Sequence, residues 1–207
     1  SEDTLRNWWL IDGPFLGPSF KPLIMKILIA CETSGTVRNA FRERGHDAWS
    51  CDVLPSVEDS SYHYQRPLED IMTYGPYGWE MLVAHPPCTF LCSSGLFRTT
   101  RGERPQWKTD EALAFVRYIM DLDIPKICIE NPVGCISTRI RKPDQYINPY
   151  LFGENASKKT GLWLKGLPLL KPTIHCEPEY YACGRKSCRH AEKYESREQC
   201  PKCRKPL

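Results

Sequence analysis

Short apolar runs, each ended by a polar or turn-forming residue, recur along the chain. Buried parallel strands are apolar along their whole length, because both faces of their sheet are covered. The runs therefore predict strands at residues 26–31, 47–51, 79–84, 126–129 and 162–164. A further strand end or turn is expected near residues 67–71.

Two segments between these runs have the period of amphipathic helices. In residues 36–44 the apolar positions share one face, and Gly45 is placed to end the helix. Residues 110–122 form the clearest helix, with Thr109 as the expected N-cap. Strands that alternate with helices predict an α/β fold.

The pattern divides the chain into three parts. Residues 1–24 show no clear period and are expected to be an N-terminal extension, whereas residues 25–172 form the α/β domain and residues 173–207 a separate tail. Within the domain, the polar stretch 96–108 and residues 135–156 are expected to be irregular. A loop as long as the first of these is usually functional or mobile.

Composition narrows the class of protein. The chain has 207 residues and 41% hydrophobic residues, which suits one globular core. No segment reaches the roughly 18 consecutive apolar residues of a membrane span, and no secretory signal is expected. Eleven cysteines, an odd number, favour reduced thiols plus a metal site over a disulfide framework, and hence a cytoplasmic location.

Positive charge is concentrated at the C-terminus. The net charge is only +3, yet residues 183–207 hold eight Lys or Arg and three Glu, so the rest of the chain is slightly acidic. A basic tail on a near-neutral body suggests an anionic partner, of which nucleic acid is the commonest, although a merely solvated tail has the same composition.

The same tail carries a cysteine pattern typical of zinc sites. Four thiolates within 21 residues can form a closed tetrahedral site, which is structural rather than catalytic. The four candidate ligands are Cys183, Cys188, Cys200 and Cys203. Free thiols or disulfides are the alternatives, and His175, Cys176 or His190 could replace one ligand. Metal binding would supply the folding energy that so short a tail lacks.

Chemistry-bearing residues gather where the predicted strands end. The turn Glu32-Thr33-Ser34-Gly35 leads into a helix, whose free N–H groups favour a polar or anionic ligand. Asp52 follows the second strand, where it could accept hydrogen bonds from a ribose or instead cap the next turn.

Two further strand ends carry a cysteine and a carboxylate. The strand 79–84 stops at Pro86 and Pro87, and Cys88 follows as either a nucleophile or a buried structural cysteine. The strand 126–129 leads into Glu130, which is either an acid–base group or a structural acid.

In their order and spacing these motifs resemble the cytosine-C5 DNA methyltransferase family, especially its short virus-encoded members. The resemblance rests on His85-Pro86-Pro87-Cys88 and Glu130-Asn131-Pro132 and covers roughly residues 25–165. It implies a Rossmann-like S-adenosylmethionine-dependent sheet, here with a small zinc-ribbon-like appendage at the C-terminus. For a virus-encoded member, the cytoplasm would be that of the host.

The family's chemistry then assigns roles. Cys88 would attack C6 of cytosine as a thiolate, Glu130 would protonate or hydrogen-bond N3, and Asn131 and Lys159 would complete the catalytic set. The residues expected to bind S-adenosylmethionine are Glu32, Thr33, Ser34, Gly35, Asp52, Asp70, Ile71 and Pro86. The expected acceptor and partner is DNA.

The chain also departs from the family pattern. Residues 157–161 stand where the family has a Gln-x-Arg-x-Arg motif, and Lys159 is the one residue there that could take the role of an arginine. The family's large recognition domain and its final Gly-Asn motif have no counterpart in this sequence. Two other hypotheses therefore stay open. One is a pyrimidine-modifying transferase that acts on RNA or a nucleotide, or uses a modified donor; the other is a non-catalytic zinc-containing nucleic-acid-binding module.

Overall fold

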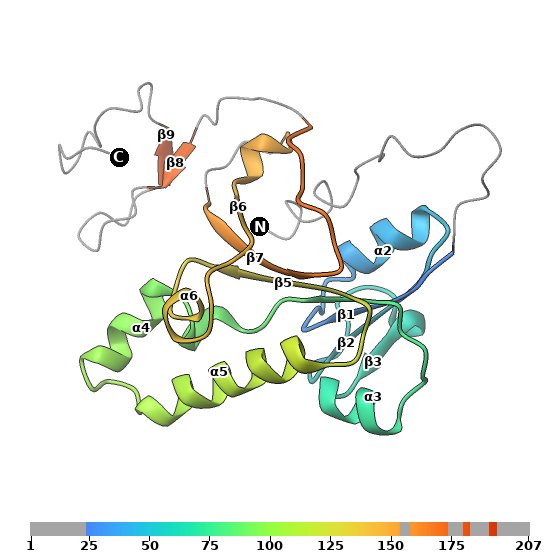
Figure 1. Cartoon of the computed structure of the whole chain (residues 1–207), viewed down its shortest axis with the longest axis horizontal. Coiled ribbons are helices and arrows are strands. Elements are labelled where there is room, and N and C mark those ends of the chain that lie inside the picture. The colour runs from blue at the N-terminus through green and yellow to red at the C-terminus, as the bar shows by residue number, and fades with distance from the viewer. Residues whose placement is uncertain (1–23, 154–157, 174–179, 183–190, 194–207) are drawn as a thin grey trace.

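A seven-stranded mixed sheet forms the centre of the protein (Figure 1). The computed structural model describes residues 24–153, 158–173, 180–182 and 191–193. The strand order is β3-β2-β1-β4-β5-β7-β6, and β7 runs antiparallel to both of its neighbours. The strands are β1 (Lys26–Ala30), β2 (Asp47–Asp52), β3 (His63–Gln65), β4 (Met81–Ala84), β5 (Lys126–Pro132), β6 (Gln145–Ile147) and β7 (Thr160–Lys165). The predicted α/β class is confirmed, and the sheet is compatible with a Rossmann-like fold.

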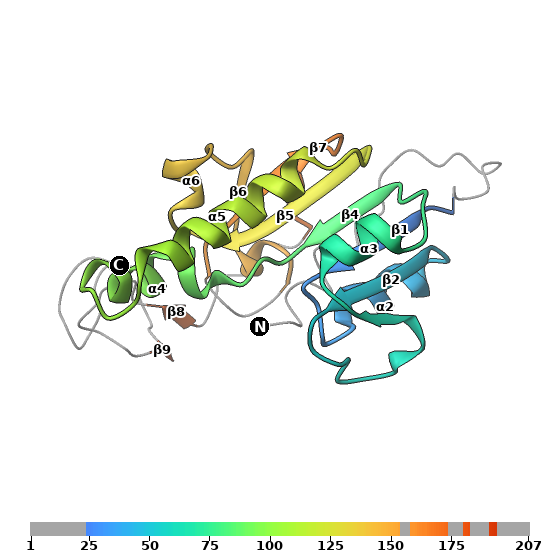
Figure 2. The same ribbon diagram turned by 90° about the horizontal axis from the view of Figure 1, so that it is seen from below.

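Helices cover both faces of this sheet. Figures 1 and 2 show α2 on one face and α3 and α5 on the other. The helices are α2 (Thr36–Glu43), α3 (Leu68–Tyr74), α4 (Ser93–Thr100), α5 (Gln106–Asp121) and α6 (Ile136–Arg139). Three 3-10 turns, η1 (Ser60–Tyr62), η2 (Cys88–Phe90) and η3 (Pro149–Leu151), lie in the connections. Strands β8 (Tyr180–Ala182) and β9 (Ala191–Lys193) form a separate antiparallel pair.

The core explains why the central strands are apolar throughout. All four residues of β4 are buried, and so are the last four of β1, because both strands have neighbours on both sides and helices on both faces. Leu113, Val116 and Ile119 of α5 pack on one face, whereas Val37 and Phe41 of α2 pack on the other.

Several boundaries differ from the sequence prediction. Helix α5 begins one turn earlier, after Pro105, so Thr109 is not its N-cap but lies buried within the helix. Much of the expected 96–108 loop belongs to α4 and α5. Strand β5 continues to Pro132, because beyond Ile129 its registered partner is β7 alone, and a proline is tolerated where one side of a strand is open.

The topology fixes where a ligand can bind. Strands β1 and β4 are neighbours although β2 and β3 lie between them in sequence, so the chain leaves the sheet in opposite directions at their carboxyl ends. In open α/β sheets, such a switch point is the usual ligand-binding crevice. In the part of the chain that the structure describes, no helix is long and apolar enough to cross a membrane.

Candidate active site

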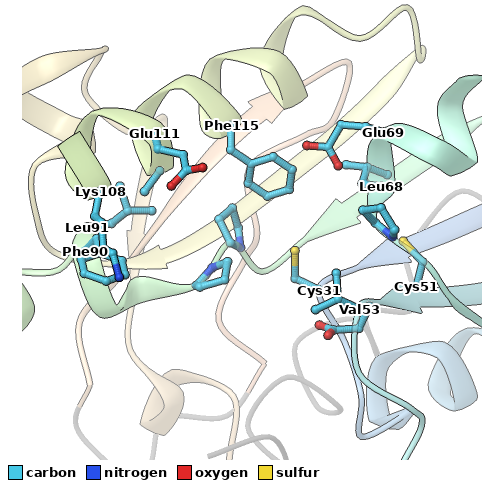
Figure 3. Close-up of a pocket in the computed structure, with 15 residues that line it drawn as sticks. Cys31, Cys51, Val53, Leu68, Glu69, Phe90, Leu91, Lys108, Glu111 and Phe115 are labelled. Atoms are coloured by element: carbon cyan, nitrogen blue, oxygen red, sulfur yellow. The ribbon is translucent and has the colours of Figure 1, made fainter.

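A cavity of about 410 Å³ lies at this switch point. Its floor is formed by the carboxyl ends of β1, β2 and β4, and its other walls come from α3 and α5. Figure 3 shows Phe115 and Glu111 reaching into it from α5, Leu68 and Glu69 from α3, and the Cys31 thiol from the end of β1. The cavity is therefore large enough for a nucleoside-sized ligand.

The lining combines apolar surface with carboxylates. Asp52, Glu69 and Glu111 contribute three acidic groups, whereas Lys108 is the single basic residue among the described residues of the lining. The Asp52 carboxylate also accepts a hydrogen bond from the backbone N–H of Leu54 at 2.9 Å, so it both caps the turn after β2 and borders the cavity. This lining suits a ligand with a flat apolar ring, hydroxyl groups and a positive charge.

Among the cavity thiols, Cys31 has an unusual backbone. Its φ of 60° lies in the left-handed region, which is uncommon for a residue other than glycine. Burial raises the pKa of the Cys31 thiol to about 12, and burial also raises the pKa of Cys51. Both groups therefore remain protonated near neutral pH and are poor nucleophiles.

The turn before α2 satisfies its own backbone. The buried Glu32 carboxylate accepts hydrogen bonds from the N–H groups of Val37 at 2.6 Å and Arg38 at 3.3 Å. Burial raises the pKa of Glu32, against the opposing effect of His85. The expectation that this helix start offers free N–H groups to an anion is therefore wrong for these two amides. Gly35 has a φ of 74°, which favours glycine, and a Cβ atom at this position would overlap the buried Arg38 guanidinium.

The proline pair ends β4 as the sequence predicted. The N–H of His85 still donates to the Ala30 carbonyl at 3.0 Å, after which Pro86 and Pro87 line the cavity. Cys88 then begins η2, and its side chain is exposed, whereas Cys92 is buried. The exposure of Cys88 contradicts its interpretation as a buried structural cysteine.

Side chains at the end of β5 hold the loop after β4. The buried Asn131 amide donates a hydrogen bond to the Pro86 carbonyl at 2.7 Å. The His85 Nδ1 atom lies 3.3 Å from the Glu130 Oε2 atom. The two candidate catalytic strand ends are thus tied together, and the contact of Asn131 is a positioning one.

Backbone contacts extend this link beyond Cys88. The N–H of Ser93 donates to the Val133 carbonyl at 3.0 Å, and the N–H of Cys135 donates to the Leu91 carbonyl at 2.8 Å. Between them, Gly134 lies so close to the Leu91 carbonyl that a Cβ atom would overlap it. The segment after Cys88 is therefore held against the loop that follows Glu130.

Neighbouring groups influence the Cys88 thiol in opposite directions. Partial burial and the adjacent Cys92 thiol raise the pKa of Cys88, and the charge of Lys158 lowers it. Lys159, the residue predicted from the sequence, instead lies over the Tyr146 ring with its Nζ atom 4.4 Å from the ring centre. Lys158 is therefore the cation that the sequence interpretation missed.

We expect two substitutions to change Cys88 reactivity in opposite directions. Cys92→Ala should lower the pKa of Cys88 and speed its alkylation by iodoacetamide at pH 7.5, whereas Lys158→Ala should raise the pKa and slow alkylation. Peptide-resolved mass spectrometry would separate Cys88 from the other cysteines. Lys159→Ala is the matched control, and an effect of that control as large as that of Lys158→Ala would contradict the assignment.

Cations and aromatic rings gather beside Cys88. The Arg104 guanidinium lies 5.2 Å from the centre of the Phe90 ring and donates to the Thr89 carbonyl at 3.1 Å. The Lys108 ammonium lies 5.5 Å from the same ring, and the neighbouring Trp107 side chain is 59% exposed. This surface combines positive charge with exposed aromatic area, as nucleic-acid-binding surfaces do.

Other predicted site residues lie elsewhere. Asp70 is exposed and Ile71 packs in the core, so neither lines the cavity, whereas the preceding Leu68 and Glu69 do. Thr33 and Ser34 are not among the described residues that line the cavity. The Ser34 hydroxyl oxygen accepts a hydrogen bond from the Thr36 N–H at 3.2 Å, and the Thr33 carbonyl accepts one from the Ser56 hydroxyl at 3.3 Å. The four proposed zinc ligands fall outside the described residues, and within the described ranges no group of three or more His, Cys, Asp or Glu could hold a metal ion.

Comparison of the sequence with protein-family models and with curated proteins finds no match. Any function must therefore be argued from the geometry at the carboxyl ends of β1, β4 and β5.

Proposed function

We propose that this protein is an S-adenosylmethionine-dependent DNA (cytosine-C5) methyltransferase. One observation carries the proposal: the exposed Cys88 thiol follows β4, and the loop that bears it is tied to Glu130 and Asn131 of the neighbouring β5. The cavity behind the two prolines adds room for a cofactor next to this pair.

The chemistry of the cavity fits S-adenosylmethionine. Leu68, Phe115 and Pro86 offer apolar surface for an adenine ring, and Asp52 and Glu69 offer acceptors for hydroxyl and amino groups. The excess of carboxylates suits a sulfonium cation. When bound, this cofactor supplies an electrophilic methyl group.

The residues outside the cavity would act on the base. Cys88, as a thiolate, forms a bond to C6 of cytosine while a proton passes from the Glu130 carboxyl group to N3, which leaves C5 nucleophilic. After C5 is methylated, loss of the C5 proton to a base expels the Cys88 sulfur, and the N3 proton returns to Glu130. The nucleophile and the acid are thus both regenerated.

Access to the base would require it to leave the duplex. A cytosine in double-stranded DNA must be flipped out before C6 can be attacked. Arg104 and Lys108 lie near the Phe90 ring, and Arg101 lies over the Phe97 ring. These three cations are suited to bind phosphates, a role in which they confer affinity but no sequence preference. The zinc-binding tail and its contact with DNA stay predictions from the sequence.

The decisive experiment is transfer of a labelled methyl group from S-adenosylmethionine to unmethylated DNA. Label at C5 of cytosine supports the proposal. Label in RNA or a free nucleotide but not in DNA favours the alternative transferase. Cofactor binding with no acceptor labelled would point to a modified donor or another substrate, and absence of cofactor binding would favour the non-catalytic module.

Adjacent acidic residues provide a test of the cofactor cavity. Glu69→Ala should weaken S-adenosylmethionine binding about tenfold, because it removes a hydrogen-bond acceptor from the cavity wall. Asp70→Ala is the matched control and should leave the affinity unchanged, since Asp70 is exposed outside the cavity. Isothermal titration calorimetry measures both. The reverse result would assign the cofactor contact to Asp70, as the family resemblance implied.

A further inference from the structure

His85 contacts the carboxylate of Glu130 on β5 and acts electrostatically on Glu32 after β1. The His85 Nδ1 atom lies 3.3 Å from Glu130 Oε2, and both side chains are 12% exposed. On the other side, the charge of His85 lowers the pKa of the buried Glu32, which burial raises. The second ring nitrogen, Nε2, is buried and has no hydrogen-bond partner among the described residues. His85 therefore lies between the turn beside the cofactor cavity and the acid proposed to act on the base.

We propose that His85 is a positioning residue that shares one proton with Glu130, so that the pair retains the proton that Glu130 delivers to the target pyrimidine. This inference rests on the proposed function. It adds a residue for which the family resemblance gives no role.

Over the whole reaction, the His85–Glu130 pair neither gains nor loses a proton. Before the reaction, the proton resides either on Glu130 or, as an imidazolium, on His85 Nδ1. When the Cys88 sulfur bonds to C6, the proton passes through Glu130 to N3, leaving a carboxylate and a neutral imidazole. When the sulfur departs, N3 returns the proton to Glu130, and the pair regains its single proton.

Titratable groups from neighbouring elements surround this pair. Glu32 from the turn after β1 adds a second carboxylate near the imidazole, and Arg38 from α2 partly offsets its charge. Within β5, Cys128 is buried beside Glu130, and burial raises its pKa, so it remains a neutral thiol. The positive charge of Lys158 lowers the pKa of Cys88. A nearby anion stabilises the protonated form of an imidazole–carboxylate pair.

The sharing can be tested without any substrate. In the full-length protein, ¹⁵N spectra of the histidine rings would be recorded for the wild type and for Glu130→Gln at the same pH. The ¹⁵N chemical shift of His85 Nδ1 should differ between the two proteins, because in the variant this nitrogen no longer faces a carboxylate that can share its proton. His46 and His63, which have no contact with Glu130 in the structure, serve as internal controls. Identical His85 nitrogen shifts in the two proteins would overturn the proposal.

A second test uses the reaction itself. His85→Asn keeps an amide nitrogen near the Nδ1 position but cannot take up a proton. Its kcat should match the wild type at pH 6 within about twofold and fall at least about tenfold below it at pH 8, with KM for S-adenosylmethionine unchanged. A uniform loss at every pH would indicate a merely structural role and refute the proposal. If the wild type transfers no methyl group, the proposed function fails, and the ring spectra alone decide whether the proton is shared.

Discussion

Cys88→Ala is expected to lower methyl transfer to cytosine by at least about 1,000-fold, because no other exposed thiol in the described part of the chain lies at the carboxyl ends of β4 and β5. The same variant should form no covalent complex with an oligonucleotide that contains 5-fluorocytosine, whose C5 fluorine blocks release of the enzyme. Gel analysis under denaturing conditions would show the complex for the wild type alone.

The control for this experiment lies one helical turn further along the chain. Cys92→Ala removes a buried thiol next to Cys88 but leaves Cys88 in place, so this variant should still form the covalent complex. S-adenosylmethionine binding should also persist in Cys88→Ala, since Cys88 is not among the described residues that line the cavity. A fully active Cys88→Ala protein would contradict both the nucleophile and the reaction.

Glu130→Gln is expected to lower kcat by about 10²–10⁴-fold, the range that general acid catalysis contributes. The glutamine amide can hydrogen-bond to N3 but cannot supply a proton, so formation of the covalent adduct should slow. The affinity for S-adenosylmethionine should stay the same, because Glu130 does not border the described cavity. Single-turnover kinetics would locate the defect in the chemical step.

A carboxylate outside the site provides the comparison. Glu103 is an exposed residue paired with Arg101 at 3.8 Å, so Glu103→Gln should leave kcat within about twofold of the wild type. Equal losses in the two variants would indicate a general effect of charge on DNA binding, and the acid role of Glu130 would then be withdrawn.

The elements that the sequence predicted well are those with the strongest burial pattern. Strands β1, β4 and β5 are apolar because the sheet is covered on both faces, so their positions could be read directly. The short elements β3, β6 and α6 have only three or four residues each, too few for any periodicity to show. Helix α4 was hidden because it presents no buried residues and its polar sequence resembles a loop.

The candidate site could be predicted to about the same extent. Cys88 and Glu130 follow from strand ends, because parallel strands bring their carboxyl ends to one edge. It is harder to predict which of two adjacent residues faces the cavity. Glu69 borders the cavity and Asp70 does not, because the side chains of neighbouring helical residues point about 100° apart. The same difficulty applies to Lys158 and Lys159, which only the structure distinguishes: Lys159 lies over the Tyr146 ring, and the charge of Lys158 lowers the pKa of Cys88.

The two prolines after β4 have a consequence for the order of events. Pro86 and Pro87 border the cavity, and the Asn131 amide donates a hydrogen bond from β5 to the Pro86 carbonyl, so one stiff and anchored loop joins the cofactor cavity to Cys88. Under the proposed function, the methyl group passes directly from the cofactor to the base that Cys88 holds, so both ligands must be bound at once. We therefore expect sequential kinetics through a ternary complex.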